Sequence, residues 1–229
     1  MDYDHDGTND VVGCGFDGFI EWFRGQGGTR FASGIRLRDK NGKDIHDGQY
    51  WGDEEKKWMA EKDGQLLLHA LLIDWDDDAD LDILLAGRSG RLSLRINQGT
   101  ATAPAFSPDR TPVLVEGKPY GAAGGSTPSP AFVDWDGDGL KDLVVCLVSP
   151  KKVVWHRNIG QKGQPRLGRQ ETLLDFRAGS KPQTCNRLSV ADYNGDGLLD
   201  LIIGGGFYIS NSEADSGAWI YLRETTATR

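Results

Sequence analysis

Cysteine, histidine, methionine and long apolar runs are all scarce in this sequence. Its 229 residues include three cysteines, four histidines and two methionines. No stretch approaches the roughly 20 consecutive apolar residues of a membrane-spanning helix, so membrane insertion is not expected. The chain carries no signal-peptide pattern, and no stripe of lysine and arginine indicates a nucleic-acid partner. The sequence also has no triad-like context for a nucleophile, and we predict no catalytic residue from it.

The cysteines are Cys14, Cys146 and Cys185, an odd number, so at least one lies outside any pair within the chain. Cys14 and Cys146 stand in apolar, strand-like runs, and no metal-type cysteine spacing is present. We therefore expect these side chains to be small buried hydrophobic groups.

Aspartate is abundant, and it is concentrated in a nine-residue motif with the pattern D-x-[DN]-x-D-G-x-x-D. Four copies occur, here called loops 1 to 4: DYDHDGTND at Asp2–Asp10, DWDDDADLD at Asp74–Asp82, DWDGDGLKD at Asp134–Asp142 and DYNGDGLLD at Asp192–Asp200. Carboxylates at every second position repel one another unless a cation lies among them. Calcium, a hard cation that takes six to eight oxygen ligands, fits this pattern. Four bound Ca²⁺ ions would bring the formal net charge of −8 close to zero.

Positions 1, 3, 5 and 9 and the carbonyl group of position 7 of each loop are the predicted calcium ligands. They are Asp2, Asp4, Asp6, Thr8 and Asp10; Asp74, Asp76, Asp78, Asp80 and Asp82; Asp134, Asp136, Asp138, Leu140 and Asp142; and Asp192, Asn194, Asp196, Leu198 and Asp200. Glycine at position 6 permits the sharp turn, and Ala79 replaces it in loop 2. An EF-hand is excluded because it requires a glutamate at position 12, where this chain has Gly13, Leu85, Val145 and Ile203. Asp77 and Asp80 add two nearby carboxylates to loop 2, so we expect its affinity to differ from the others.

The residues around each loop predict β-strands. An apolar strand B follows each loop, at Val11–Gly15, Ile83–Gly87, Leu143–Leu147 and Leu201–Gly205. A strand C with alternating polarity comes next, at Phe19–Arg24, Leu92–Asn97, Val153–Asn158 and Trp219–Arg223. A strand D is expected at Thr29–Ala32, Pro112–Glu116 and Glu171–Phe176, and a strand A precedes the last three loops at Leu66–Ile73, Pro130–Val133 and Arg187–Ala191. Four antiparallel strands in about 60 residues are typical of a propeller blade.

These units resemble FG-GAP/VCBS repeats, the calcium-loop blades of integrin α-subunit heads and of many bacterial surface proteins. The resemblance implies an all-β β-propeller with about four blades, at 1–43, 65–124, 125–182 and 183–229. Because relatives usually have about seven blades, and both terminal blades here lack one strand, we expect an open part of a larger propeller. A closed four-bladed ring and assembly between chains are the alternatives, and open blade faces would favour self-association.

The resemblance also implies a calcium-stabilised binding or scaffold module that is secreted, periplasmic or on the cell surface, with a role such as cell adhesion or carbohydrate binding and a protein or carbohydrate partner. The insertion 44–64 is the least repetitive segment, and its Tyr50, Trp51 and Trp58 are candidate ligand-binding residues. A solvated excursion, or a short helix over EEKKWMAEK, is the alternative for this segment. The alternative function is a piece of a polysaccharide lyase or sugar dehydratase, and a ligand-free spacer is a third.

Overall fold

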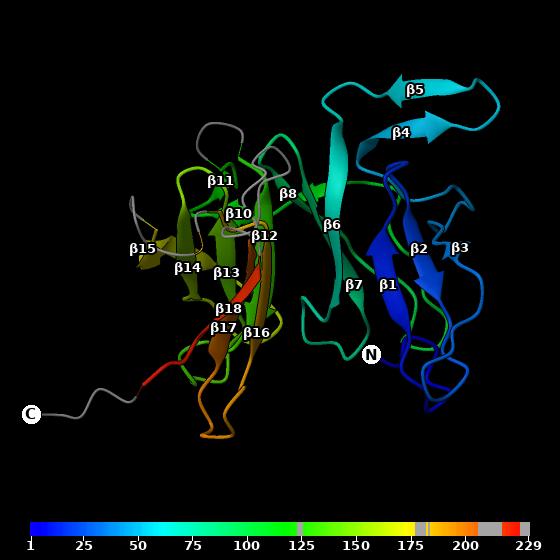
Figure 1. Ribbon diagram of the computed structural model, residues 1–229. Coiled ribbons are helices and arrows are strands. Elements are labelled where there is room, and N and C mark those ends of the chain that lie inside the picture. Colours follow the sequence, from blue (N-terminus) through cyan, green and yellow to red (C-terminus); the bar gives the residue numbers. More distant parts are fainter. Residues whose placement is uncertain (123–125, 177–181, 183, 206–216, 225–229) are drawn as a thin grey trace, which may run out of the picture. The chain divides into compact units, whose positions relative to one another are not determined.

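The computed structural model describes residues 1–122, 126–176, 182, 184–205 and 217–224. The described residues contain strands and turns but no helix, hence none long and apolar enough to cross a membrane (Figure 1). The chain divides into two compact units. The first comprises Met1–Leu114, Lys118–Gly121 and Lys162–Gln164, and the second comprises Val115–Gly117, Ala122–Gln161 and Pro165–Arg229.

The first unit contains two antiparallel sheets built around loops 1 and 2. One sheet has the order β1-β2-β3, with β1 at Val11–Cys14, β2 at Ile20–Phe23 and β3 at Ile35–Arg36. The other has the order β6-β7-β8-β9, with β6 at Gln65–Ile73, β7 at Asp82–Gly87, β8 at Leu92–Arg95 and β9 at Thr111–Pro112. A hairpin of β4 (Gly48–Gly52) and β5 (Lys57–Ala60) extends this sheet, because β4 pairs in parallel with the start of β6.

The second unit also contains two sheets, built around loops 3 and 4. The larger has β12 at Pro128–Val133, β13 at Asp142–Leu147, β14 at Lys152–Asn158 and β15 at Leu167–Asp175, in antiparallel pairs. Val115 of the short strand β10 (Leu114–Val115) pairs in parallel with Leu167 of β15, and β11 (Lys118–Pro119) follows in the chain. The smaller sheet has the order β16-β17-β18, at Arg187–Ala191, Asp200–Gly205 and Gly217–Tyr221.

Each unit has its own apolar core between its two sheets. All residues of β7 and of β13 are buried, which explains why these strands are apolar on both faces. The first core contains Ile20, Ile45, Leu67, Leu72, Ile83, Leu85 and Phe106. The second contains Val144, Val153, Phe176, Leu188, Leu201 and Ile203. The four sheets are blades of the β-propeller type, so the predicted all-β fold class is confirmed.

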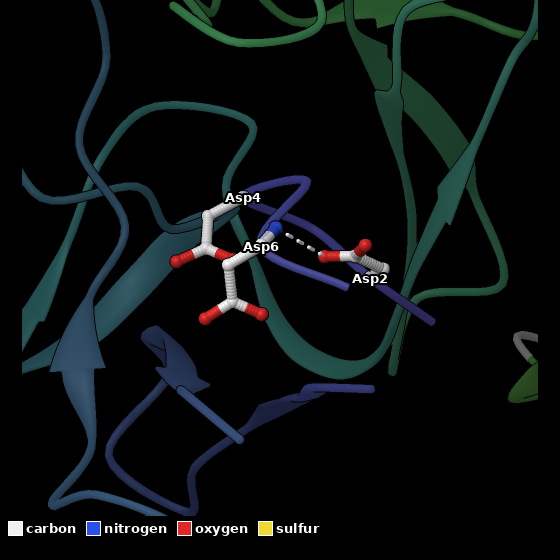
Figure 2. A group of neighbouring side chains, drawn as sticks. All are labelled: Asp2, Asp4 and Asp6. Carbon is white, nitrogen blue, oxygen red and sulfur yellow. Dashed lines mark hydrogen bonds between the residues drawn. The ribbon is translucent and has the colours of Figure 1, made fainter. Parts of the chain in front are cut away.

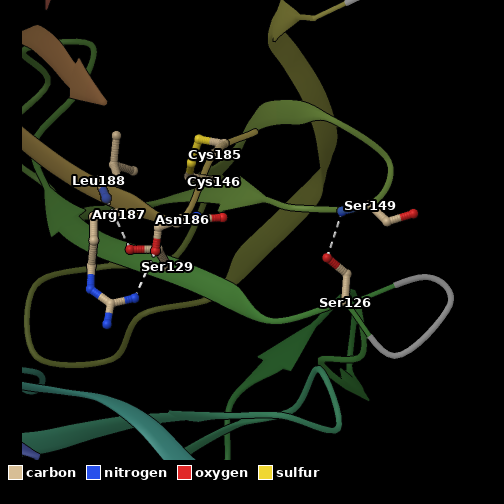
Figure 3. The surroundings of a disulfide bond; sticks show 8 residues. All are labelled: Ser126, Ser129, Cys146, Ser149, Cys185, Asn186, Arg187 and Leu188. Carbon is tan, nitrogen blue, oxygen red and sulfur yellow. Dashed lines mark hydrogen bonds between the residues drawn. A yellow bond between two sulfur atoms is a disulfide. The ribbon is translucent and has the colours of Figure 1, made fainter. Parts of the chain in front are cut away.

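A disulfide bond lies in the second core and corrects the expectation for the cysteines. Cys146 of β13 is bonded to Cys185, just before β16, and neither residue is exposed (Figure 3). Their Cα atoms are 5.8 Å apart, which is within the range that a disulfide requires. Both residues are buried, as expected of Cys146, but they form a covalent link between the two sheets of this unit and are not two independent thiols.

Strands A, B and C form within about two residues of their predicted ranges, whereas strand D departs from its predicted range in all three sheets where it was expected, and in the third it is β15, which begins at Leu167. Strand D of the first sheet is β3, not Thr29–Ala32, because Gly27 and Gly28 adopt positive φ angles and close a tight turn first. No helix forms in the insertion. The turn before β5, which ends at Lys56 with φ at 52°, allows Trp51 to pair with Trp58 across the β4–β5 hairpin. In the second sheet, β9 ends at Pro112, and Leu114–Val115 forms the separate strand β10.

Candidate metal-binding loops

The acidic loops connect strands A and B, and they share one backbone form. Loop 2 joins β6 to β7, loop 3 joins β12 to β13, loop 4 joins β16 to β17, and loop 1 precedes β1. Positions 4 and 6 of every loop have positive φ angles, a conformation that glycine adopts without strain. In loop 2 these positions are Asp77 and Ala79, with φ of 57° and 73°. Loop 2 therefore keeps the common form without either glycine.

The aspartate at position 9 holds each loop closed. One of its carboxylate oxygens accepts the backbone N–H of position 2, and the other accepts a backbone N–H at the end of strand C. The position 9 residues are Asp10, Asp82, Asp142 and Asp200, and the strand C donors are Gly25, Asn97, Asn158 and Arg223. Asp10 is 5% exposed and the other three are 0% exposed. The position 9 carboxylate is thus a buried bracket between the loop and its sheet, besides being a predicted ligand.

The position 1 and position 5 aspartates also bind backbone N–H groups. In loop 3, Asp134 accepts the N–H groups of Gly137, Asp138 and Gly139. Asp192 in loop 4 accepts the same three bonds, and Asp2 in loop 1 accepts the last two. The position 5 side chain accepts the N–H of position 7 in all four loops. These bonds orient the carboxylates toward the inside of the loop.

Three of the four loops bring carboxylates close enough to share one cation. The groups, each with ligand atoms within 4.8 Å of one another, are Asp2, Asp4 and Asp6; Asp74, Asp76 and Asp78; and Asp134, Asp136 and Asp142. Figure 2 shows the group in loop 1, where the N–H of Asp6 donates to Asp2. Loop 4 has Asn194 at position 3, and the amide of this residue donates to Asp196.

Buried carboxylate oxygens test whether a cation fits these loops. Within the described part of the chain, Oδ1 of Asp4, of Asp76 and of Asp80 is buried and accepts no hydrogen bond. A buried oxygen that carries negative charge and has no donor is costly, and a hard cation would satisfy it. The donor set is oxygen only, as Ca²⁺ prefers. The residues therefore fit a calcium ion.

Asp80 is a residue whose side chain was not predicted as a ligand. Only its carbonyl group was expected to contribute, yet its side chain is 5% exposed and close enough to Asp74, Asp76 and Asp78 for their charges to act on it. The signal in the sequence is an aspartate at position 7, which occurs in loop 2 alone.

Arginine side chains reach two of the loops, and sequence reasoning missed them. Nε of Arg24 lies 2.6 Å from Asp4, and its Nη2 lies 2.9 Å from Asp6. In loop 3, Arg157 makes the same contacts with Asp136 at 2.7 Å and Asp138 at 2.9 Å. Both arginines immediately precede the strand C residue whose N–H binds the position 9 aspartate, and this spacing was readable in the sequence.

The pKa shifts of loops 2 and 3 differ before position 9, whereas burial raises the pKa of the position 9 aspartate in both. Burial, followed by repulsion from Asp78, raises the pKa of Asp76 and of Asp80. Burial raises the pKa of Asp82 to about 6, against the hydrogen bonds from Asn97 and Trp75. In loop 3, the N–H of Leu140 and the guanidinium of Arg157 lower the pKa of Asp138. In loop 2 the carboxylates of Asp76 and Asp80 are thus repelled by their neighbours, whereas in loop 3 the carboxylate of Asp138 has a guanidinium partner.

The candidate ligand-binding residues lie on the β4–β5 hairpin and point in two directions. The Tyr50 ring packs against His46, with centroids 4.1 Å apart, and against Phe19 at 5.3 Å. Trp51 and Trp58 lie opposite each other in the hairpin, edge to face at 6.1 Å, and Trp58 is 46% exposed. Tyr50 thus belongs to an aromatic cluster within the first unit, whereas the Trp51–Trp58 pair faces solvent at one edge.

The blade form and the repeated acidic loops define a repeat protein of the β-propeller type. A family model described as FG-GAP-like repeat matches residues 74–145 and 134–203, and a model described as FG-GAP repeat matches residues 186–221. These matches cover more than half of the chain, which belongs to the FG-GAP repeat family. Repeats of this family are typical of extracellular or surface proteins. No curated protein matches the chain.

Proposed function

We propose that this chain is a calcium-stabilised β-propeller module that binds a protein or carbohydrate partner outside the cytoplasm. The observation that carries the calcium proposal is the pair of buried oxygens without hydrogen-bond donors, Oδ1 of Asp76 and Oδ1 of Asp80, in a loop form that the chain repeats four times. The family supports the broader role, because its repeats and fold suggest a binding or scaffold module.

Calcium would be held by the predicted ligands of each loop, with the side chain of Asp80 added in loop 2. The ion would supply positive charge that offsets the repulsion among the carboxylates and joins the two strands that each loop connects. The chain's own contribution is the position 9 bracket, which fixes the loop to its sheet. The role of the ion is structural.

An extracellular or periplasmic location is supported by the Cys146–Cys185 disulfide bond. Disulfides persist in oxidising compartments and are rare in the cytosol. Extracellular calcium is also abundant enough to fill sites of modest affinity. Both arguments agree with the compartments in which the repeats of this family typically occur.

The Trp51–Trp58 pair is the proposed partner-binding surface. Indole rings offer a large, rigid apolar area that stacks on a sugar ring or packs on an apolar side chain. Trp58 lies on the β4–β5 hairpin, which is inserted between two blades. The repeated blade structure therefore does not explain why this tryptophan is exposed.

Thermal unfolding with millimolar Ca²⁺, compared with EDTA, tests the calcium proposal. An ion at 100 times its Kd stabilises the folded state by about 2.7 kcal/mol. For a chain of this size, such a gain raises Tm by roughly 5–10 °C. Millimolar Mg²⁺ is the control, because it dehydrates reluctantly and suits these loops less. Equal Tm values in Ca²⁺ and EDTA would contradict the proposal.

Affinity electrophoresis in gels containing acidic or neutral polysaccharides tests the surface for carbohydrate, and a pull-down from extracellular matrix extract tests it for protein. Trp58→Ala should remove whichever retention the unaltered chain shows. Phe16→Ala is the matched control, because Phe16 is an aromatic residue of the same unit that is 88% exposed. Equal retention of both variants would contradict a role for the indole pair.

A further inference from the structure

In every blade, one backbone N–H at the end of strand C donates to the position 9 aspartate. The donors are Gly25, Asn97, Asn158 and Arg223, and they mark an equivalent point in the four blades. The residue just before this donor differs between the blades. The preceding residues are Arg24 in the first blade, Ile96 in the second, Arg157 in the third and Leu222 in the fourth. Two blades thus place an arginine at this point and two place an aliphatic residue.

The two arginines make identical contacts although they belong to different units. Each donates Nε to the position 3 carboxylate and Nη2 to the position 5 carboxylate, at distances between 2.6 and 2.9 Å. These carboxylates are the predicted metal ligands of loops 1 and 3. A guanidinium bound to their Oδ2 atoms offsets part of the charge that would attract an ion, and an incoming ion competes with it for these oxygens.

Loop 2 has no arginine at the equivalent point and one more aspartate in the loop itself. Ile96 supplies no positive charge at the equivalent point, and Asp80 adds a carboxylate that none of the other loops has at position 7. Asp80 is 5% exposed, and its buried Oδ1 accepts no hydrogen bond from the described residues, although the Asn97 side chain also interacts with this carboxylate. This buried oxygen without a donor is the second observation, besides the acidic cluster itself, that indicates a cation.

We propose that Arg24 and Arg157 are built-in counter-cations of loops 1 and 3, and that the chain binds its first and tightest Ca²⁺ ion in loop 2 with Asp80 as an additional ligand. This proposal rests on the calcium function proposed above and ranks the loops within it. Loops 1 and 3 keep their form without an ion because the guanidinium already joins two carboxylates. Loop 2 has no such substitute at that point, so its order depends on the ion.

Reciprocal exchanges between loops test this ranking by calcium titration calorimetry of the full chain. Ile96→Arg gives loop 2 the arginine of loops 1 and 3, and Arg157→Ile gives loop 3 the residue of loop 2. Because two exposed ion pairs are being added or removed, each exchange should change affinity by about three- to tenfold. Ile96→Arg should weaken the tightest site, and Arg157→Ile should strengthen a weaker one while leaving the tightest unchanged.

Asp80→Asn and Asp80→Leu provide a second, independent measurement, since Leu140 is the natural residue at this position in loop 3. Both should weaken the tightest site by at least about tenfold, as expected when a charged ligand to Ca²⁺ is lost. Denaturation midpoints in EDTA show whether each variant folds. If Ile96→Arg does not fold, the Asp80 and Arg157 variants still report on the ranking.

The outcomes separate this proposal from the calcium function itself. Four equivalent sites in the unaltered chain, or affinities that none of these variants changes, would overturn the ranking while leaving calcium binding established. No calcium heat from the unaltered chain or from Arg157→Ile would overturn both. A tightest site that weakens in Ile96→Arg and in Asp80→Asn, and not in Arg157→Ile, would support the ranking.

Discussion

Loops 2 and 3 have the same backbone form but opposite electrostatics. Both are closed by a position 9 aspartate, Asp82 or Asp142, that is 0% exposed and accepts two backbone N–H groups. In loop 3, Arg157 joins two carboxylates, whereas in loop 2 burial and mutual repulsion raise the pKa of Asp76. We infer that the nine-residue motif specifies the shape of the loop, while the residue before the strand C donor determines how much negative charge remains for an ion.

The two units differ in a related way. The second unit has the Cys146–Cys185 bond between its sheets. The first unit has no cysteine pair among its described residues, and its larger sheet contains loop 2. We infer that the second unit depends less on the calcium proposed above than the first, because a covalent bond already joins its two sheets.

The largest expected effect is loss of the disulfide. The bond closes a loop with a sequence separation of 39, so the double variant Cys146→Ala, Cys185→Ala should lose about 4 kcal/mol of stability. Hydrogen exchange should accelerate in β13 and β17 but not in β7. Cys14→Ala is the control. Equal acceleration in both units would contradict the inferred difference between them.

Loss of the position 9 bracket should follow in size. Asp82→Ala and Asp142→Ala each leave two buried N–H groups without an acceptor, at about 1–3 kcal/mol each. Because alanine also removes a carboxylate whose burial is unfavourable, we expect a loss of about 2–4 kcal/mol in EDTA. Denaturant unfolding measures this cost, and Glu54→Ala in the exposed hairpin turn is the control. A loss in one loop alone would show that the bracket is not a shared element.

Charge removal at position 3 should have opposite signs in the two loops. In EDTA, Asp76→Asn relieves repulsion and should stabilise the chain by roughly 0.5 kcal/mol. Asp136→Asn removes a partner of Arg157 and should lower the unfolding midpoint slightly. Shifts of the same sign in both variants would contradict the charge difference between loops 2 and 3.

The smallest expected effect is a pH dependence in the second unit. His156 of β14 lies opposite Leu143 of β13, at the position that Arg95 of β8 takes opposite Ile83 of β7 in the first unit. Burial lowers the pKa of His156, against a hydrogen bond with the Gly168 carbonyl group. Below the unfolded pKa of about 6.5 the unfolded chain binds the proton more readily, so stability is lost as pH falls below that value.

Denaturation midpoints between pH 7.5 and 5.5, a window of about one unit on either side of that pKa, measure this dependence. His156→Gln should reduce it, because glutamine does not titrate. His5→Asn at an exposed position is the control and should leave it unchanged. An unchanged slope in His156→Gln would show that His156 does not contribute.

The loops and strands A to C were predictable because a repeated motif and apolar alternation specify them locally. The β4–β5 hairpin was not, since EEKKWMAEK contains good helix formers, and the hairpin depends on cross-strand pairing of Trp51 with Trp58. The Cys146–Cys185 bond joins β13 of one sheet to the segment just before β16 of the other, a proximity that sequence spacing does not reveal. The extra carboxylate of Asp80 was visible in the sequence, whereas the contacts of Arg24 and Arg157 with the loop carboxylates form only when the sheets place the end of strand C beside the loop.

Calcium titration calorimetry of Asp76→Asn and Asp136→Asn tests whether loop 2, and not loop 3, holds the tightest calcium ion. These variants make the same chemical change at the same motif position in loops 2 and 3. If loop 2 holds the tightest site, Asp76→Asn removes or strongly weakens that site, while Asp136→Asn leaves it unchanged. A tightest site that persists in Asp76→Asn and is lost in Asp136→Asn would contradict this assignment.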